Sequence, residues 1–307
     1  MPATTTTATN KTLRVLPAHE TKHLSLLAYP FRDDIVFNLA QLSDGANNGT
    51  ALWLGAQILS AYLTDTLPSP SPLPIPGSTR HSRTPRAIEL GSGVGLTSLV
   101  LAVQGWSVLA TDIPAIVLSV LRPNVQRNTR ETCLLGSVQV RALDWTVPPD
   151  NWNWDNPLSI AGTLPDGDVG TGRLDKQGLE EELLGPPFDL ILTSDTIYSR
   201  ELVTPLLRTI KHLALLSTPQ LQSPSKSHPP IYLALEVRDP TLVSYFFTQA
   251  RVEWGMDAQR VSTPRIRRAM SRSGLGDWKR EDWEGVEVWR LHLLDSQPKE
   301  ASNSVDT

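Results

Sequence analysis

The sequence predicts an α/β fold built on a mostly parallel, doubly wound sheet. Short runs rich in Val, Ile and Leu recur along the chain, as in RAIEL (86–90) and FDLILTSD (188–195), and they lack strict alternation of apolar and polar residues. Such runs are typical of strands that are buried on both faces of a parallel sheet. Segments with helical periodicity separate them, and strand alternating with helix is the pattern of a doubly wound fold.

Six strands and five helices are expected from these patterns. The strands span residues 86–90, 107–112, 138–143, 188–195, 231–237 and 286–294. The helices span 51–63, 95–104, 114–130, 199–216 and 240–254. The last strand, VEVWRLHLL, alternates more clearly than the others, so we expect it to be antiparallel and near an edge of the sheet. The first helix repeats Leu and Ala at helical spacing, which predicts that it packs on the sheet.

Three proline-rich segments interrupt this pattern, at about 64–86, 147–187 and 217–230. Their composition is typical of surface loops or partly disordered insertions. We therefore expect one domain over residues 47–296 that contains these insertions. A partly disordered N-terminal extension (1–46) would precede it, and a disordered tail (297–307) would follow it.

Composition excludes several classes of protein. The net charge of −4 argues against a chain built mainly to bind nucleic acid or an anionic membrane. A single cysteine, Cys133, excludes a disulfide framework and a cysteine-based zinc site. None of the six histidines has metal-ligand spacing, so we expect no metal. The chain lacks a signal peptide and any run of 18 apolar residues, and we expect a cytoplasmic monomer outside the membrane.

The glycine-rich turn ELGSGVG (89–95) follows the first strand of the predicted sheet. Its spacing is G-x-G-x-G, whereas dinucleotide cofactors use G-x-G-x-x-G. Glu89 beside the turn would repel a phosphate but suits a ligand with a cationic amine. Asp112 ends the next strand, where a carboxylate can accept hydrogen bonds from both ribose hydroxyls. The combination favours S-adenosylmethionine, which carries an ammonium and a sulfonium and no phosphate.

The successive motifs ELGSGVGL, LATD, ALDW (142–145) and SDTIY (194–198) resemble those of seven-β-strand methyltransferases. Asp195-Thr196-Ile197-Tyr198 matches the D-x-x-Y motif of methyltransferase family 16, a group of lysine methyltransferases, and GTALWLGAQILSAYL resembles the tryptophan-bearing helix of that family. GSVQVRALDW and SDTIYSRELVTPLLRTIKHL look closest to the branch that methylates valosin-containing protein and to its fungal relatives, which methylate elongation factor 1-alpha. The resemblance covers about residues 47–240, with gaps at the proline-rich segments.

The resemblance implies a Rossmann-like seven-strand fold, S-adenosylmethionine as cofactor, and a lysine of a cytosolic protein as substrate, such as elongation factor 1-alpha or an AAA ATPase. It also implies the residues that contact the cofactor. These are Trp53 at the methionine end, Gly91, Ser92 and Gly93 in the turn, Asp112 at the ribose, Trp145 near the adenine, and Ser194 before the D-x-x-Y aspartate. One departure is Thr146, since the family often has glycine after the ALDW tryptophan.

Asp195 and Tyr198 are the candidate catalytic residues. A lysine has an ordinary pKa near 10.4, so its neutral, nucleophilic form costs about 4.6 kcal/mol at pH 7. The Asp195 carboxylate can hold the incoming ammonium, and Tyr198 can line the channel or orient the amine from the same face of a following helical turn. We therefore assign Asp195 to binding and orientation rather than to proton removal. The alternative for Asp195 is a helix N-cap ahead of residues 197–213.

Other functions remain open at this stage. The chain could act on a small molecule or a nucleic acid, or it could be a non-catalytic partner that keeps the fold. GPPF (185–188) is interpreted as a turn, because the similar motif of nitrogen methyltransferases follows the fourth strand and this one precedes it. The basic segment RIRRAMSRSGLGDWKR (265–280) is interpreted as solvated surface, with docking of an acidic partner or nucleic acid as its alternative.

Overall fold

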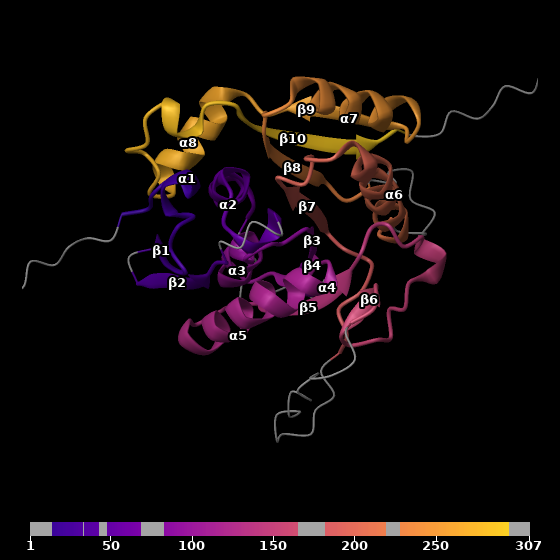
Figure 1. Ribbon diagram of the computed structural model, residues 1–307, viewed down its shortest axis with the longest axis horizontal. Coiled ribbons are helices and arrows are strands. Elements are labelled where there is room, and N and C mark those ends of the chain that lie inside the picture. Colours follow the sequence, from indigo (N-terminus) through magenta and orange to yellow (C-terminus); the bar gives the residue numbers. More distant parts are fainter. Residues whose placement is uncertain are drawn as a thin grey trace, which may run out of the picture.

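An eight-stranded sheet, in the order β6-β5-β4-β3-β7-β8-β10-β9, forms the centre of the computed structural model, which describes residues 14–32, 34–42, 48–68, 83–164, 182–218 and 228–294 (Figure 1). The strands are β3 (Arg86–Leu90), β4 (Ser107–Asp112), β5 (Ser137–Leu143), β6 (Ser159–Ala161), β7 (Leu190–Ser194), β8 (Ile231–Glu236), β9 (Met256–Arg260) and β10 (Val286–Leu293). All neighbours pair in parallel except β10, which is antiparallel to both β8 and β9. The predicted α/β class, parallel sheet and antiparallel late strand are confirmed.

Helices cover both faces of the sheet, as a doubly wound fold requires (Figure 1). One face carries α2 (Leu54–Thr66), α3 (Leu96–Val103), α8 (Thr263–Arg272), and α4 (Pro114–Ile116) joined to α5 (Arg122–Glu131) by a π-helical turn (Val117–Leu121). The other face carries α6 (Arg200–Leu216) and α7 (Pro240–Val252). Side chains of β4 alternate between these layers, since Val108 faces the first and Leu109 the second. The central strands are therefore apolar on both sides, which explains their unbroken apolar runs.

Two strands of the central sheet were not predicted. β9 has the polar sequence MDAQR and pairs only with β10, so it has no apolar run to reveal it. β6 is three residues long and lies in the segment 147–187 that was interpreted as an insertion. It extends the sheet beyond the seven strands that the family resemblance implied.

The segment after β5 is folded where the structure describes it, which corrects the expectation of a loose insertion over 147–187. Arg141 of β5 is fully buried, and its guanidinium donates hydrogen bonds to the carbonyls of Trp154, at 2.8 Å, and Leu184. Trp154 also packs against the rings of Trp152 and Phe188. The buried cation and the aromatic cluster hold this segment on the sheet. Burial lowers the pKa of Arg141 to about 10.

The N-terminal extension predicted for residues 1–46 also contains regular structure. It forms a short helix α1 (Ala18–Thr21) and an antiparallel hairpin of β1 (Leu26–Arg32) and β2 (Ile35–Ala40). Phe37 and Leu39 are fully buried in the main core, so the hairpin belongs to the domain. Pro30 within β1 weakens the strand pattern in the sequence, which explains why the hairpin was not predicted.

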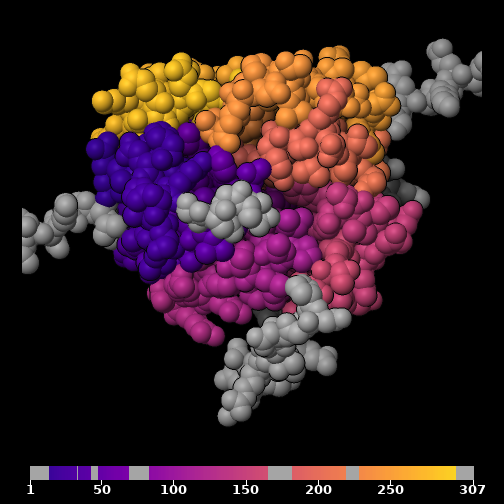
Figure 2. All heavy atoms as spheres, viewed as in Figure 1, coloured from indigo at the N-terminus to yellow at the C-terminus, as the bar shows by residue number. Residues whose placement is uncertain are grey.

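The basic segment 265–280 is not simply solvated surface. Its first half lies in α8, whose arginines Arg265, Arg267 and Arg268 are exposed while Ile266 and Ala269 are buried. Trp278 is buried too and donates a hydrogen bond from Nε1 to the carbonyl of Val15 at 3.0 Å. Figure 2 shows the C-terminal segment (yellow) lying against the N-terminal hairpin region (indigo). The segment thus contains an amphipathic helix, and the chain after that helix is attached to the N-terminal part of the domain.

Several expectations concern residues outside the described ranges. The residues concerned are the first 13, parts of the proline-rich segments (69–82, 165–181 and 219–227) and the tail from residue 295. Among the helices that the structure describes, none combines the length and apolarity needed to cross a bilayer. The GPPF turn precedes β7, as predicted.

Asn124 of α5 offers a test of how the hairpin is attached. Its fully buried side chain accepts a hydrogen bond from Ala40 N at 2.7 Å, and donates to the carbonyls of Ala40 at 3.0 Å and Val94 at 3.1 Å. Asn124→Ala leaves these backbone groups without a partner, and we expect it to lower the free energy of unfolding by about 2 to 4 kcal/mol in urea denaturation. Gln126→Ala, an exposed change on the same helix, should change it by less than about 0.5 kcal/mol. Equal effects of the two substitutions on the free energy of unfolding would mean that Asn124 does not anchor the hairpin.

Candidate active site

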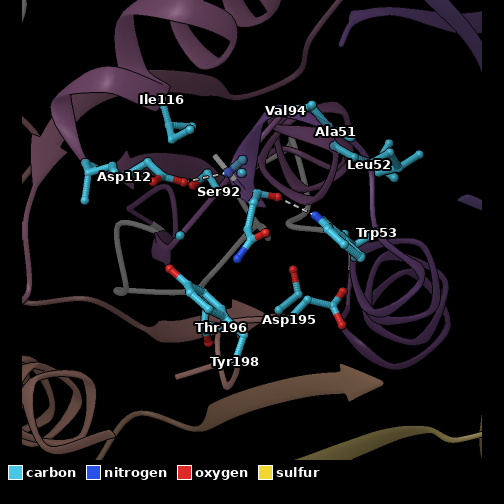
Figure 3. A pocket seen from close by; sticks show the side chains of 18 of the residues that line it. Ala51, Leu52, Trp53, Ser92, Val94, Asp112, Ile116, Asp195, Thr196 and Tyr198 are labelled. Carbon is cyan, nitrogen blue, oxygen red and sulfur yellow. Dashed lines mark hydrogen bonds between the residues drawn. The ribbon is translucent and has the colours of Figure 1, made fainter. Parts of the chain in front are cut away.

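A cavity of about 290 Å³ opens at the carboxyl ends of the parallel strands, where doubly wound folds bind ligands. Nine of the ten predicted site residues line it, and Glu89 does not. Figure 3 shows Asp112 and Ile116 at one end, with Trp53 and Asp195 at the other. The lining residues are Asn48, Gly49, Ala51, Leu52, Trp53, Ala56, Gly91, Ser92, Gly93, Val94, Leu96, Asp112, Ile113, Ile116, Asp144, Trp145, Ser194, Asp195, Thr196, Tyr198 and Leu202.

The glycine turn between β3 and α3 requires residues without a side chain. Gly91 has φ +69° and Gly93 has φ +53°, a conformation that favours glycine. A Cβ on Gly91 would lie 2.7 Å from Thr196 Cγ2, and one on Gly93 would lie 3.2 Å from the carbonyl oxygen of Gly49. The turn is therefore packed against two other segments of the cavity wall, and the bare backbone is what lets them meet.

Asp112 connects this turn to the end of β4. Its Oδ2 accepts a hydrogen bond from Gly93 N at 2.9 Å, and its Oδ1 accepts one from Ile113 N at 2.8 Å. Burial raises the pKa of Asp112 to about 6, and these two backbone donors oppose that shift. Each oxygen retains acceptor capacity for a second donor from a ligand.

Glu89 has a different position from the one predicted. The side chain is 1% exposed and lies beneath the turn, where its carboxyl group accepts a hydrogen bond from Ser98 Oγ of α3. Its backbone carbonyl accepts another from Thr111 Oγ1 at 2.7 Å. Burial raises the pKa of Glu89 to about 7, and hydrogen bonds from Ser98, Thr97 and Ser92 oppose that shift. Glu89 thus supports the turn from below, and a direct contact with a ligand amine, as predicted, is not what the structure provides.

Asp195, at the end of β7, is the most unusual residue of the site. It is the one non-glycine residue with positive φ, +53°, among those the structure describes, and such strain is typical of functional positions. Its Oδ1 accepts a hydrogen bond from Glu236 N at 3.1 Å, whereas its buried Oδ2 has no partner among the described residues. Burial raises the pKa of Asp195 to about 6. An unpartnered buried carboxylate oxygen at a cavity wall is suited to receive a donor from a ligand.

Asp195 does not cap the following helix, which removes that alternative. Helix α6 begins at Arg200 with Ser199 in the N-cap position. Residues 196–199 are therefore a loop, and Asp195 and Tyr198 do not share a helical face, contrary to the prediction. Both still line the cavity, and Tyr198 is 50% exposed at its opening.

Trp53 forms the wall beside Asp195 and is held from several sides. Its Nε1 donates a hydrogen bond to the carbonyl of Asn48 at 2.6 Å. The Lys22 ammonium lies 3.1 Å from the centre of its ring, and the Arg238 guanidinium carbon lies at 4.2 Å. Burial and the charge of Arg238 lower the pKa of Lys22, whereas Glu236 and Asp195 raise it. The end of the cavity near Asp195 is thus bordered by two cations.

Trp145 and Ser194 complete the predicted set. Trp145 is largely buried, and its Nε1 has no hydrogen-bond partner among the described residues. Its carbonyl accepts a hydrogen bond from Arg208 of α6 at 2.7 Å, which fixes the strand end that carries the tryptophan. Ser194 lies at the end of β7, directly before Asp195, and is nearly buried.

Sequence reasoning missed several lining residues. Val94, Asp144 and Thr196 lie inside motifs that were recognised, so their proximity could have been inferred from their neighbours. Asn48 and Ile116 carry no comparable signal, because only the folded chain brings them to the turn. One surface group, His19 with Glu20 and Asp282, has metal-ligand geometry among the described residues, but it lies outside the cavity lining.

Comparisons with known proteins agree with the motifs. Residues 33–161 match the model of a family described as lysine methyltransferase, methyltransferase family 16, which confirms the resemblance drawn from the sequence. The match includes the glycine turn, Asp112 and Trp145, and it ends before Asp195.

Three relatives are similar to this chain over part of its length. Protein-lysine N-methyltransferase rrg1 of Schizosaccharomyces pombe is 37% identical over 107 residues, which cover 34% of this chain and 31% of the relative. Protein-lysine methyltransferase METTL21E of Mus musculus is 32% identical over 41% of this chain and 39% of the relative. EEF1A lysine methyltransferase 3 of Mus musculus is 26% identical, covering 54% and 51%. The chain therefore spans between about a third and a half of the relatives it matches.

The buried Glu89 predicts how stability depends on pH. A carboxyl whose pKa is raised from 4.5 to about 7 binds its proton more tightly in the folded state, so its contribution to stability falls as pH rises through this interval. Glu89→Gln removes the ionisation while keeping an acceptor for Ser98. As the pH rises from 5 to 8, we expect the free energy of unfolding of the variant, measured by urea denaturation, to increase by about 2 kcal/mol relative to that of wild type. The exposed Glu284→Gln should show no such change, and a pH-independent difference for Glu89→Gln would contradict the assignment.

Proposed function

We propose that this chain is an S-adenosylmethionine-dependent protein-lysine N-methyltransferase. The observation that carries the proposal is the convergence of two motifs on one cavity. The glycine turn with Asp112 lies at one end, and the unpartnered Oδ2 of Asp195 lies beside the other. The first belongs to the region matched by the lysine methyltransferase family, and the second comes from outside it.

The residues at the turn fit the cofactor. Asp112 offers acceptor positions to the ribose hydroxyls, and the flat ring of Trp145 with Ile113 and Ile116 offers an apolar surface for the adenine. The bare backbone of Gly91 lets Thr196 and the ring of Trp145 pack against the turn. S-adenosylmethionine would supply a methyl group made electrophilic by its bond to a positively charged sulfur.

The other end of the cavity fits a lysine side chain. Asp195 lines the cavity and its Oδ2 has no hydrogen-bond partner among the described residues, so the carboxyl group has capacity to accept a hydrogen bond from the acceptor nitrogen. The exposed Tyr198 lies at the opening, where its ring or hydroxyl can border the entering side chain. Methyl transfer is an in-line displacement, so holding the nitrogen on the line of the breaking bond is the main task of these residues.

We further propose a cytosolic protein as the acceptor. Elongation factor 1-alpha is the first protein to test, since one relative is named an EEF1A lysine methyltransferase, and an AAA ATPase is the second, from the motif resemblance. A single cysteine suits the reducing cytosol.

Cofactor binding is tested through Asp112. We expect S-adenosylhomocysteine, and not NAD, to raise the melting temperature, because a ligand that binds only the folded state stabilises it. Asp112→Asn keeps the shape of the side chain and the acceptor for Gly93 but removes the charge. It should weaken the calorimetric affinity for S-adenosylhomocysteine about tenfold or more. Asp144→Asn, a change at a nearby lining residue, is the matched control and should weaken it less. Unchanged affinity in Asp112→Asn would remove the basis for this pocket.

Acceptor binding is tested through Asp195 and Tyr198. Asp195→Ala removes the partner of a desolvated cation and should slow methyl transfer into protein by about thirty- to several-thousand-fold, with cofactor affinity retained. Tyr198→Phe keeps the ring, so a small loss would indicate a lining role and a large loss an orienting role. The readout is labelled methyl incorporation that protease digestion removes and nuclease digestion leaves. Full activity in Asp195→Ala, or label lost only to nuclease, would refute the proposal.

A further inference from the structure

A second cavity, of about 270 Å³, lies between α2, the start of α8 and the strands β8, β9 and β10. It shares no lining residue with the candidate active site. Its lining is rich in arginine and tyrosine and contains no acidic residue: Tyr62, Tyr232, Gln259, Arg260, Val261, Ser262, Arg265 and Arg290.

The strand register builds the floor of this cavity. Arg290 of β10 lies directly opposite Tyr232 of β8 on one side and Gln259 of β9 on the other. Directly opposite residues in antiparallel strands place their side chains on the same face, so these three form a row across the sheet. Tyr62 of α2 packs onto Tyr232 edge to face, with ring centres 5.8 Å apart. The row and the helix together give a fixed, concave surface.

The positive charge of the cavity is only partly compensated. Arg260 forms an ion pair with Glu287 at 2.9 Å. The nearby Asp65 is held by Arg272 at 2.7 Å, outside the cavity lining. Arg265 and Arg290 form no ion pair with any residue that the structure describes. Two guanidinium groups therefore face the same cavity without a counter-charge.

The tyrosines add unused hydrogen-bond donors. Neither hydroxyl has a hydrogen-bond partner in the part of the chain that the structure describes, and both hydroxyl oxygens remain accessible to solvent from the cavity. Burial and the neighbouring Tyr232 raise the pKa of Tyr62, so its hydroxyl keeps its proton. A hydroxyl in such a place gains from a ligand that brings an acceptor.

We propose that this cavity binds a phosphate group, either free or as a small monoester, between Arg265 and Arg290 above the two tyrosines. Two uncompensated guanidinium groups match the charge of about −1.5 to −2 that a phosphate monoester carries at pH 7. Guanidinium forks and hydroxyls together can satisfy three phosphate oxygens at once. Strand β8 runs from this cavity to the candidate active site: Tyr232 lies near its start, and Glu236, which donates a backbone hydrogen bond to Asp195, lies at its end.

The test measures binding of inorganic phosphate to the full chain by calorimetry and by melting temperature, against chloride at equal ionic strength. We expect a saturable rise in melting temperature. The double variant Arg265→Ala/Arg290→Ala should weaken phosphate affinity about tenfold or more, since charge-assisted hydrogen bonds are lost. Arg267→Ala/Arg268→Ala makes the same charge change on α8 at residues outside the lining of this cavity and should leave phosphate affinity unchanged.

Tyr62→Phe provides a second variant that leaves every charge in place and should weaken binding a few-fold. Tighter binding of phenyl phosphate than of inorganic phosphate would assign the site to monoesters, and equal binding would assign it to phosphate itself. Equal losses in both arginine double variants, or none in Arg265→Ala/Arg290→Ala, would overturn the proposal. Because no methyl transfer is measured, the result is independent of the function proposed for the first cavity.

Discussion

The candidate active site depends on one constraint: three carboxyl groups are desolvated near the C-terminal ends of the parallel strands. Glu89 is buried and Asp112 and Asp195 are half-buried, and desolvation raises the pKa of each. Their hydrogen-bond donors come from Ser98, from the backbone of the turn, and from the end of β8. The left-handed glycines follow from this arrangement, because Gly93 can donate to Asp112 only while the turn keeps its shape.

The same constraint determines the residues around Asp195. A Cβ on Gly55 would lie 2.4 Å from its Oδ2, so helix α2 can approach the carboxyl group only because residue 55 is glycine. Trp53, two residues earlier, then stands beside the carboxylate and is fixed by Asn48. Thus the segment before and within α2 does more than cover the sheet. It supplies one wall of the cavity, and the family match beginning at residue 33 includes it.

The sequence was sufficient to predict the parts of the fold that local patterns encode. Central strands such as β3 are buried on both faces and therefore appear as apolar runs, and eight of the nine predicted residues that line the cavity lie in motifs at strand ends. The rest depends on contacts between distant segments. The hairpin is held by Asn124, and the segment after β5 is held by the buried Arg141. A polar residue gives no sign in the sequence that it will be buried. Tyr198 was placed on a helical turn that follows Asp195, whereas residues 196–199 are a loop, and the positive φ of Asp195 that begins this loop is likewise not encoded in residue spacing.

The cations near Trp53 bear on how a lysine would lose its proton at the proposed site. The Asp195 carboxylate alone would raise the pKa of an acceptor lysine, which opposes attack by the neutral amine. Lys22 shows the balance of forces at this place, since burial and Arg238 lower its pKa more than Asp195 and Glu236 raise it. An acceptor ammonium that enters beside Lys22 meets the same desolvation and an additional positive charge. Asp195 can therefore orient the nitrogen while the surrounding cations favour its neutral form, so binding and deprotonation need not be performed by the same residue.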